Sequence, residues 1–126
     1  MPGRYAMLHA SCHCGAVTIE VFDKPASVTQ CTCSICHRYG ARWAYCTRST
    51  ASVSCNPGDI AAYSWGDKSL EFYHCKHCGC LTHYESVEKL DNSRVAVNSR
   101  MMSPADIADV PVRTFDGAKT WEYLDD

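Results

Sequence analysis

Ten cysteines, most of them gathered in three short clusters, constrain what this chain of 126 residues can fold into. The clusters are a C-x-C pair at residues 12–14, a C-x-C-x-x-C run at residues 31–36, and residues 75–80, which include a C-x-x-C pair. Cys46 and Cys55 stand apart from them. Core cysteines scattered by chance would not gather at spacings of two and three residues, so the clusters indicate either disulfides or metal ligands.

The redox compartment decides between those two interpretations. Residues 1–9 hold no apolar segment long enough for a secretory signal, and no run in the chain approaches the roughly 18 apolar residues of a membrane span. We therefore expect a cytoplasmic protein with no membrane partner, in a reducing environment where thiols stay free or bind metal. On that expectation the clustered cysteines are zinc ligands, and the chain is a small zinc domain.

Length and charge narrow the class of protein further. A chain of 126 residues is long enough for one modest core, so residues 1–126 are expected to form a single domain. The formal net charge is −2 before any thiol ionises. Because phosphate contacts dominate nucleic-acid affinity, an acidic chain argues against a nucleic-acid partner. Nothing in the sequence indicates an oligomeric state.

Short runs rich in β-branched and aromatic residues predict strands. These runs are residues 16–22, 41–46, 70–74, 81–85, 94–98 and 120–123. Proline, glycine and aspartate turn signals separate them, as at residues 56–59. Ser103 followed by Pro104 offers an N-cap and a first helical residue, which predicts one short helix over residues 103–108. The pattern as a whole predicts a mainly β fold of antiparallel sheets with that helix added.

Zinc is bound in proteins by about four ligands in a tetrahedron, and closely spaced cysteine pairs supply two ligands from one tight turn. Gly15 and Gly79 each follow a cysteine directly, which lets the loop turn so that backbone N–H groups approach the sulfurs. Two sites fit: a closed four-cysteine site built from two pairs, and a three-cysteine site in residues 31–36 with an open position. Closed sites are structural and open ones admit water or substrate, but spacing alone does not decide which clusters share a metal.

Taken in order, these motifs resemble the glutathione-dependent formaldehyde-activating enzyme family, which includes the centromere protein V-like proteins. The resemblance is carried by residues 11–17, 31–41, 73–79, 94–100 and 115–117. It implies a β-tent fold of antiparallel sheets, shared with methionine-R-sulfoxide reductases, and two Zn²⁺ ions per chain. The ligands that it implies for a structural zinc are Cys12, Cys14, Cys75 and Cys78. Those that it implies for a second, catalytic-type zinc are Cys31, Cys33 and Cys36.

The family's named reaction is the synthesis of S-(hydroxymethyl)glutathione from glutathione and formaldehyde. The resemblance therefore implies a carbon–sulfur lyase whose partner is a small-molecule thiol such as glutathione. Thiol addition to an aldehyde needs a thiolate and stabilisation of the oxygen that becomes an alkoxide, and zinc with an open position suits either need. We expect Cys33 to be catalytic as well as a ligand, and His37 to be the acid–base residue, because imidazole titrates near neutral pH. Arg38, Arg42 and Arg100 could orient the carboxylates of glutathione.

Two residues depart from the family pattern and keep other functions open. His37 stands where family members carry a basic residue after the third cysteine of the second motif, and Cys80 stands where a non-ligand residue is expected. A non-catalytic zinc scaffold that binds a protein or chromatin partner is the main alternative, which Cys80 would favour by closing the second site. A sulfoxide reductase, suggested by the shared fold, would need a reactive cysteine outside both sites, for which Cys80 is the candidate.

Overall fold

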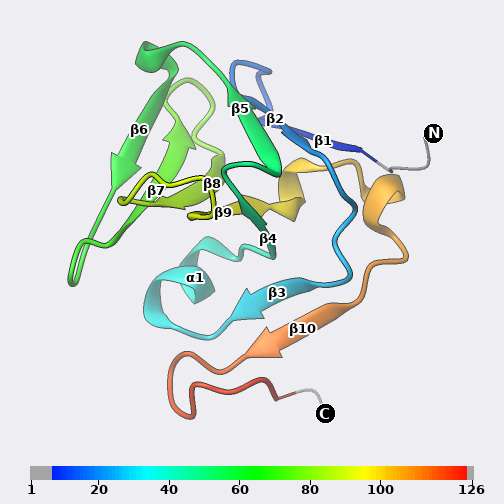
Figure 1. The fold of residues 1–126 in the computed structure, drawn as a ribbon, viewed down its shortest axis with the longest axis vertical. Helices are drawn as coiled ribbons and strands as arrows, with labels where there is room; N and C mark the ends of the chain where they lie inside the picture. Colours follow the sequence, from blue (N-terminus) through cyan, green and yellow to red (C-terminus); the bar gives the residue numbers. More distant parts are fainter. Residues whose placement is uncertain (1–6, 125–126) are drawn as a thin grey trace.

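A computed structural model describes residues 7–124 of the protein (Figure 1). The strands are β1 (Leu8–Ser11), β2 (Thr18–Val21), β3 (Val28–Cys31), β4 (Trp43–Thr47), β5 (Ala51–Ser54), β6 (Ile60–Tyr63), β7 (Leu70–Cys75), β8 (Leu81–Ser86), β9 (Arg94–Asn98) and β10 (Val112–Phe115). The helices are α1 (Ser34–Tyr39) and three 3₁₀ turns, η2 (Pro57–Asp59), η3 (Ser99–Met101) and η4 (Pro104–Ile107).

The strands form two sheets. The small sheet has the order β1-β2-β5, and the large sheet has the order β10-β3-β4-β9-β8-β7-β6. Neighbouring strands run antiparallel except for β10 and β3, which are parallel and pair Val112 with Val28 and Phe115 with Cys31. This pairing brings the C-terminal part of the chain beside the start of the C-x-C-x-x-C run, as the lower half of Figure 1 shows.

The large sheet buries different residues on its two faces because side chains alternate along each strand. One face packs against the small sheet, and its buried apolar cluster includes Ala44, Val95 and Val97 together with Ile19 and Val21. The opposite face buries a second cluster around α1. That cluster contains Cys36, Ala41, Trp43, Phe72, Leu81, Tyr84 and Ala96. The second face is therefore the aromatic one, and it carries the C-x-C-x-x-C run.

The predicted mainly β fold is confirmed, as are the strands predicted near residues 16–22, 41–46, 70–74, 81–85 and 94–98. The sheets are antiparallel as predicted, apart from the parallel pair β10 and β3. No strand forms at residues 120–123, where Tyr123 makes only an isolated bridge to Phe115. The physical reason is a tight turn, in which the Asp116 side chain accepts hydrogen bonds from the backbone N–H and the hydroxyl of Thr120.

A short helix forms where it was predicted, as the 3₁₀ turn η4 (Pro104–Ile107), with Ser103 at its N-cap and Pro104 at its start. The sequence did not predict a second short helix. The α-helix of the described residues is α1, inside the cysteine run. It ends at Gly40, whose left-handed φ of 65° lets its N–H bond the carbonyls of Cys36 and His37. Among residues 7–124, no helix combines the length and apolar character needed to cross a membrane.

Candidate metal centres and active site

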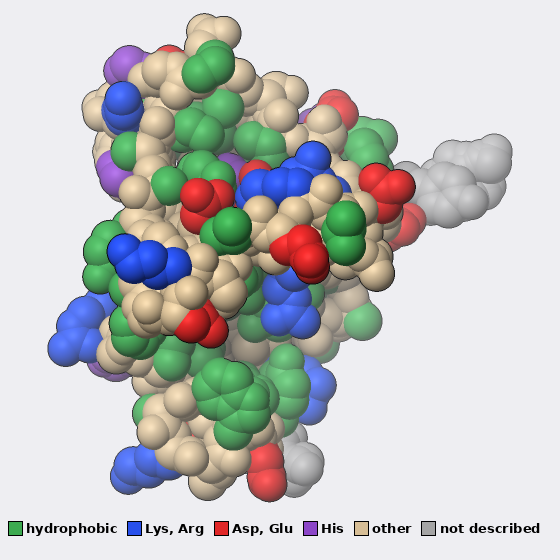
Figure 2. All heavy atoms as spheres, turned by 60° about the vertical axis from the view of Figure 1, so that its left-hand side comes forward, with side chains coloured by type: hydrophobic (Ala, Val, Ile, Leu, Met, Phe, Trp, Pro, Cys, Tyr) green, Lys and Arg blue, Asp and Glu red, His purple; other side chains and the backbone are tan. Residues whose placement is uncertain are grey.

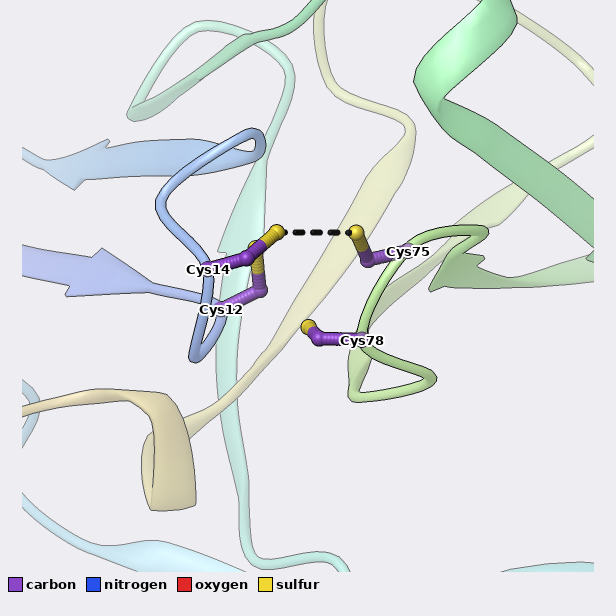
Figure 3. A group of neighbouring side chains, drawn as sticks. All are labelled: Cys12, Cys14, Cys75 and Cys78. Carbon is purple, nitrogen blue, oxygen red and sulfur yellow. Dashed lines mark hydrogen bonds between the residues drawn. The ribbon is translucent and has the colours of Figure 1, made fainter.

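The first cysteine group lies where two loops face each other (Figure 3). Cys12 and Cys14 come from the loop between β1 and β2, while Cys75 ends β7 and Cys78 lies in the turn before β8. Their four sulfurs all lie within 4.8 Å of one another, with 3.7 Å between Cys12 and Cys14 and 3.6 Å between Cys14 and Cys75. A tetrahedron with metal–sulfur bonds of about 2.3 Å has sulfur–sulfur edges of roughly 3.8 Å. The group therefore fits a metal ion.

Glycines and backbone amides shape both loops. Gly15 and Gly79 adopt φ angles of 84° and 82°, which side chains rarely tolerate. Their N–H groups bond the carbonyls of Cys12 and Cys75 at 3.1 and 2.9 Å. The amide of Val17 also points at the Cys12 sulfur, 3.3 Å away. The amide of His77 points at the Cys75 sulfur in the same way, 3.4 Å away. The contacts from Val17 and His77 stabilise thiolates at Cys12 and Cys75, as expected when cysteines are metal ligands.

Ionisation of this group is already favoured at Cys78. The backbone N–H groups of Cys80 and Cys14 point to its sulfur and lower the pKa of the Cys78 thiol to about 5. The pKa of Cys12 is also lowered, since the Val17 amide and the neighbouring thiols of Cys14 and Cys75 outweigh the effect of burial. The site therefore presents negative charge at neutral pH, which a metal cation would neutralise.

The second cysteine group lies at the base of α1. Cys31 ends β3, Cys33 is the N-cap of α1, and Cys36 lies in the helix and is buried. Their sulfurs also lie within 4.8 Å of one another, and no fourth histidine, cysteine or carboxylate of residues 7–124 joins them. The buried indole N–H of Trp43 donates to the Cys36 sulfur over 3.4 Å. Three ligands with a fourth position open is the arrangement of catalytic rather than structural metal sites.

The three thiols of this group differ in acidity. Burial raises the pKa of Cys33, but the amides of Cys36 and Ile35 and the neighbouring thiols lower it by more, so it lies below its ordinary value. Burial raises the pKa of Cys31 and of Cys36, and the nearby Cys33 raises both further. Cys33 is therefore the first of the three to become a thiolate.

The loop after β10 packs directly against the second group. Thr32 donates from its hydroxyl to Asp116 over 2.8 Å, which fastens this loop to the cysteine run. A Cβ atom on Gly117 would lie 2.7 Å from the Cys31 sulfur and 3.1 Å from the Cys33 Cβ. Only glycine fits at position 117 while the cysteines keep their places.

A cavity of about 980 Å³ opens beside the second group. All three of its cysteines line the cavity, while the first group does not. Much of the remaining wall is aromatic and comes from Tyr45, Trp65, Phe72, Tyr84, Phe115, Trp121 and Tyr123. A concave apolar site of this volume with reactive polar groups at one end is typical of small-molecule binding.

Arg94 supplies a positive charge to this cavity that the sequence interpretation missed. Its guanidinium lies 4.3 Å from the centroid of the Tyr45 ring. Burial raises the pKa of Tyr84 although Arg94 lowers it, so the Tyr84 hydroxyl is a hydrogen-bond donor at neutral pH. Strand alternation could have revealed Arg94, because it lies two residues from Ala96 and so faces the same side of the sheet.

The other residues proposed from the sequence lie outside the large cavity. His37 is exposed on α1 and lines a smaller cavity, which also includes Cys31, Cys36 and Arg100. The cations are engaged elsewhere: Arg38 and Arg100 donate to the backbone carbonyls of Ser34 and Gly40. Arg42 holds a buried Nε without a hydrogen-bond partner, and it lines neither cavity.

Cys80 lies beside the first group rather than the second. Its thiol interacts with those of Cys78 and Cys12, and its apolar surroundings are those of Cys75. Cys46 packs against the core between the sheets, and Cys55 packs beside the first group. None of these three cysteines is a member of either group that could hold a metal ion.

Substitution of Gly117 tests how closely the C-terminal loop controls the second group. Gly117→Ala should displace Cys31 or the loop and weaken metal binding at the second group by about tenfold or more, a typical loss when the surroundings of metal ligands change. Cobalt titration, followed by thiolate-to-metal absorption, should then show one tight equivalent in the variant where the parent shows two. Gly58→Ala is the matched control, since a Cβ there meets nothing within 4 Å. Two undiminished equivalents in Gly117→Ala would contradict this packing.

Comparisons with known proteins agree with this geometry. The family model described as "Glutathione-dependent formaldehyde-activating enzyme" matches residues 7–113. A protein of Rhodobacter sphaeroides, solved by X-ray crystallography as a structural genomics target, is 29% identical with a TM-score of 0.66, and the match covers 83% of this chain and 99% of that one. Comparison with curated proteins yields no match. Because the family model spans most of the chain and both cysteine groups, the protein belongs to the glutathione-dependent formaldehyde-activating enzyme family.

Proposed function

We propose that this protein is a zinc-dependent enzyme of the carbon–sulfur lyase type that acts on the adduct of a thiol with an aldehyde. Glutathione with formaldehyde, giving S-(hydroxymethyl)glutathione, is the pair that the family description suggests. The observation that carries the proposal is the second cysteine group, whose three sulfurs converge at the wall of a large cavity. A purely structural metal site would have no reason to open onto such a space.

Two zinc ions would be held by different residues and serve different ends. The ligands of the structural zinc would be Cys12, Cys14, Cys75 and Cys78, and those of the catalytic-type zinc would be Cys31, Cys33 and Cys36. The second zinc, with its open position, would supply Lewis acidity and would favour the thiolate form of a substrate thiol. The sulfur-only donor sets and their short sulfur–sulfur separations fit zinc better than a hard cation such as magnesium.

The chain's own residues would bind and orient the reactants. In the forward reaction a carbon–sulfur bond forms as the carbonyl π bond breaks, and the thiol proton ends on the former carbonyl oxygen. The protonated hydroxyl of Tyr84 could donate a hydrogen bond to that oxygen, and Arg94 could pair with a substrate carboxylate. Cys33, the most acidic thiol of its group, is proposed as a catalytic residue as well as a ligand.

His37 is proposed as an acid–base residue that works from the far side of the cysteine run. The small cavity that it lines shares Cys31 and Cys36 with the large one. The cysteine loop therefore lies between the imidazole and the large cavity. A proton that moves between His37 and the cysteine group would therefore pass through the small cavity. The proposed role of His37 is to exchange this proton with solvent.

The position of Cys80 argues against the two alternatives, the zinc scaffold and the sulfoxide reductase. A scaffold with two closed sites needs Cys80 at the second group, but this thiol contacts Cys78 in the first. A sulfoxide reductase needs a reactive thiol facing the substrate. The backbone of His13 lowers the pKa of Cys80, yet burial and Cys78 raise it by more, and Cys80 does not line the large cavity. These contacts favour the enzyme with an open second site.

Substitutions in the two groups should have different consequences. Cys78→Ser removes a ligand that joins the two sheets, so we expect insoluble protein or a loss of more than about 3 kcal/mol, which lowers Tm by roughly 10 °C or more. Cys33→Ser should leave a folded protein with about one zinc ion in place of two. Metal analysis and thermal melts check both, with Cys46→Ser as a control outside the two groups. A Cys78→Ser protein that melts like the parent would refute the proposed structural site.

The catalytic proposal predicts that the protein changes the rate at which a thiol and an aldehyde form their adduct. Zinc-loaded protein should accelerate hemithioacetal formation from glutathione and formaldehyde above the matched rate without protein, and calorimetry should detect glutathione binding. Cys33→Ser should abolish both effects, since it removes the site. Cys46→Ser should retain them. An unchanged rate together with no thiol binding to fully loaded protein would instead support the non-catalytic scaffold that binds a protein or chromatin partner.

A further inference from the structure

The large cavity is lined for a flat, apolar ligand. Hydrophobic side chains gather near the foot of the face drawn in Figure 2, and the exposed ones in the structure include two tryptophans of the cavity wall. Trp121 is 70% exposed and Trp65 is 47% exposed. Indole rings exposed at the mouth of a concave site offer planar surface that a ligand ring can cover. Charged side chains are few there, since Arg94 and Asp67 are the charged members of the described lining.

Trp121 is held in position by its surroundings. Its φ of 61° lies in the left-handed region that bulky residues avoid, so the neighbouring contacts must over-determine it. Its backbone N–H donates to the backbone carbonyl of Asp116 over 2.7 Å. Its ring packs edge-to-face against Phe115, with a centroid distance of 5.2 Å. Asp116 is in turn bonded to Thr32 of the cysteine run. The backbone of Trp121 is therefore tied to the cysteine run, while its indole contacts Phe115 and remains exposed.

Trp65 reaches the same cavity from a distant part of the chain. It begins the turn between β6 and β7, in which the Lys68 N–H bonds the Trp65 carbonyl over 3.0 Å. Gly66 and Lys68 adopt φ angles of 63° and 58°, and the Asp67 carboxylate accepts from the Ser69 amide over 3.1 Å. This tight turn fixes the backbone that carries the second indole. Two separate loops thus each contribute an exposed tryptophan to one cavity.

Glutathione and formaldehyde alone would use little of this surface. Glutathione has no ring and carries two carboxylates, whereas Arg94 is the one cation in the described lining of the cavity. Formaldehyde has a single carbon. Their complex would place no ring against the aromatic wall, although ligands in binding sites of such volume normally match the apolar walls that bury them.

We propose that the thiol adduct handled in this cavity carries a planar aromatic group and one carboxylate. The ring would pack against Trp65 and Trp121, the carboxylate would pair with Arg94, and the sulfur would reach the three-cysteine group. This inference rests on the proposed function for its sulfur chemistry. The aromatic and carboxylate recognition rests on the cavity wall alone.

Matched thiols test the inference on zinc-loaded protein by calorimetry. The probe is 4-(mercaptomethyl)benzoate, and its control is 4-(mercaptomethyl)cyclohexanecarboxylate, which has the same polar groups without the aromatic ring. We expect the aromatic thiol to bind about tenfold or more tightly than the cyclohexane analogue, because stacking on two indoles adds to burial. Equal affinities of the two thiols would overturn the inference.

Substitutions test which residues of the cavity cause the preference for the aromatic thiol. Trp65→Leu and Trp121→Leu should each reduce the aromatic preference several-fold, while Tyr63→Leu, at a 50% exposed aromatic residue outside the cavity, should leave it unchanged. Arg94→Gln should weaken both carboxylate probes and leave their methyl esters unaffected. Retention of the full preference in both tryptophan variants, each shown to be folded by its zinc content and melting curve, would overturn the inference.

The same titrations separate this inference from the proposed function. If glutathione and both matched thiols bind with equal affinity, the aromatic inference fails and the thiol enzyme stands. If 4-methylbenzoate, which lacks a thiol, binds as tightly as the aromatic thiol, the aromatic site stands and the sulfur chemistry fails. If no probe binds, both fail.

Discussion

The convergence of four cysteine sulfurs between the two sheets is the interaction on which the rest of the structure depends. Thiolates at 3.6–3.7 Å repel one another strongly, so their crowding is stable only when protons or a cation offset the charge. Cys78 already favours the thiolate, which makes a metal the simpler solution. The group joins the β1–β2 loop of the small sheet to the β7–β8 turn of the large one, far apart in sequence. A small core gains much from such a link.

The two faces of the large sheet differ, since one packs against the small sheet and the other borders the cavity. Ala44, Val95 and Val97 pack toward the small sheet, whereas residues one step along the same strands face the cavity. The second cysteine group sits at the edge of that aromatic face, supported by the Trp43 indole and by the loop that holds Gly117 against Cys31. The core between the two sheets is therefore distinct from the residues that line the cavity, whereas Phe72 and Tyr84 belong both to the second buried cluster and to the cavity wall.

Local patterns in the sequence predicted the features that depend on neighbours along the chain. The cysteine spacings predicted two metal sites, while the family resemblance indicated which cysteines form each group. Alternation located β7, β8 and β9 within a residue or two. Features built by distant segments escaped prediction: the parallel pairing of β10 with β3, and the meeting of Trp65 with Trp121 at one cavity. Residues 120–123 mimic a strand locally, but hydrogen bonds to Asp116 hold them in a turn.

Zinc K-edge X-ray absorption on protein loaded with two equivalents of zinc tests the central claim most directly. A closed four-cysteine site and an open three-cysteine site predict an average of about 3.5 sulfurs and half a lighter atom per zinc, because the two groups hold four and three cysteines. Saturation with a small thiol should raise the average to about four sulfurs. Four sulfurs at both sites without added thiol, or a spectrum that thiol does not change, would contradict an open second site.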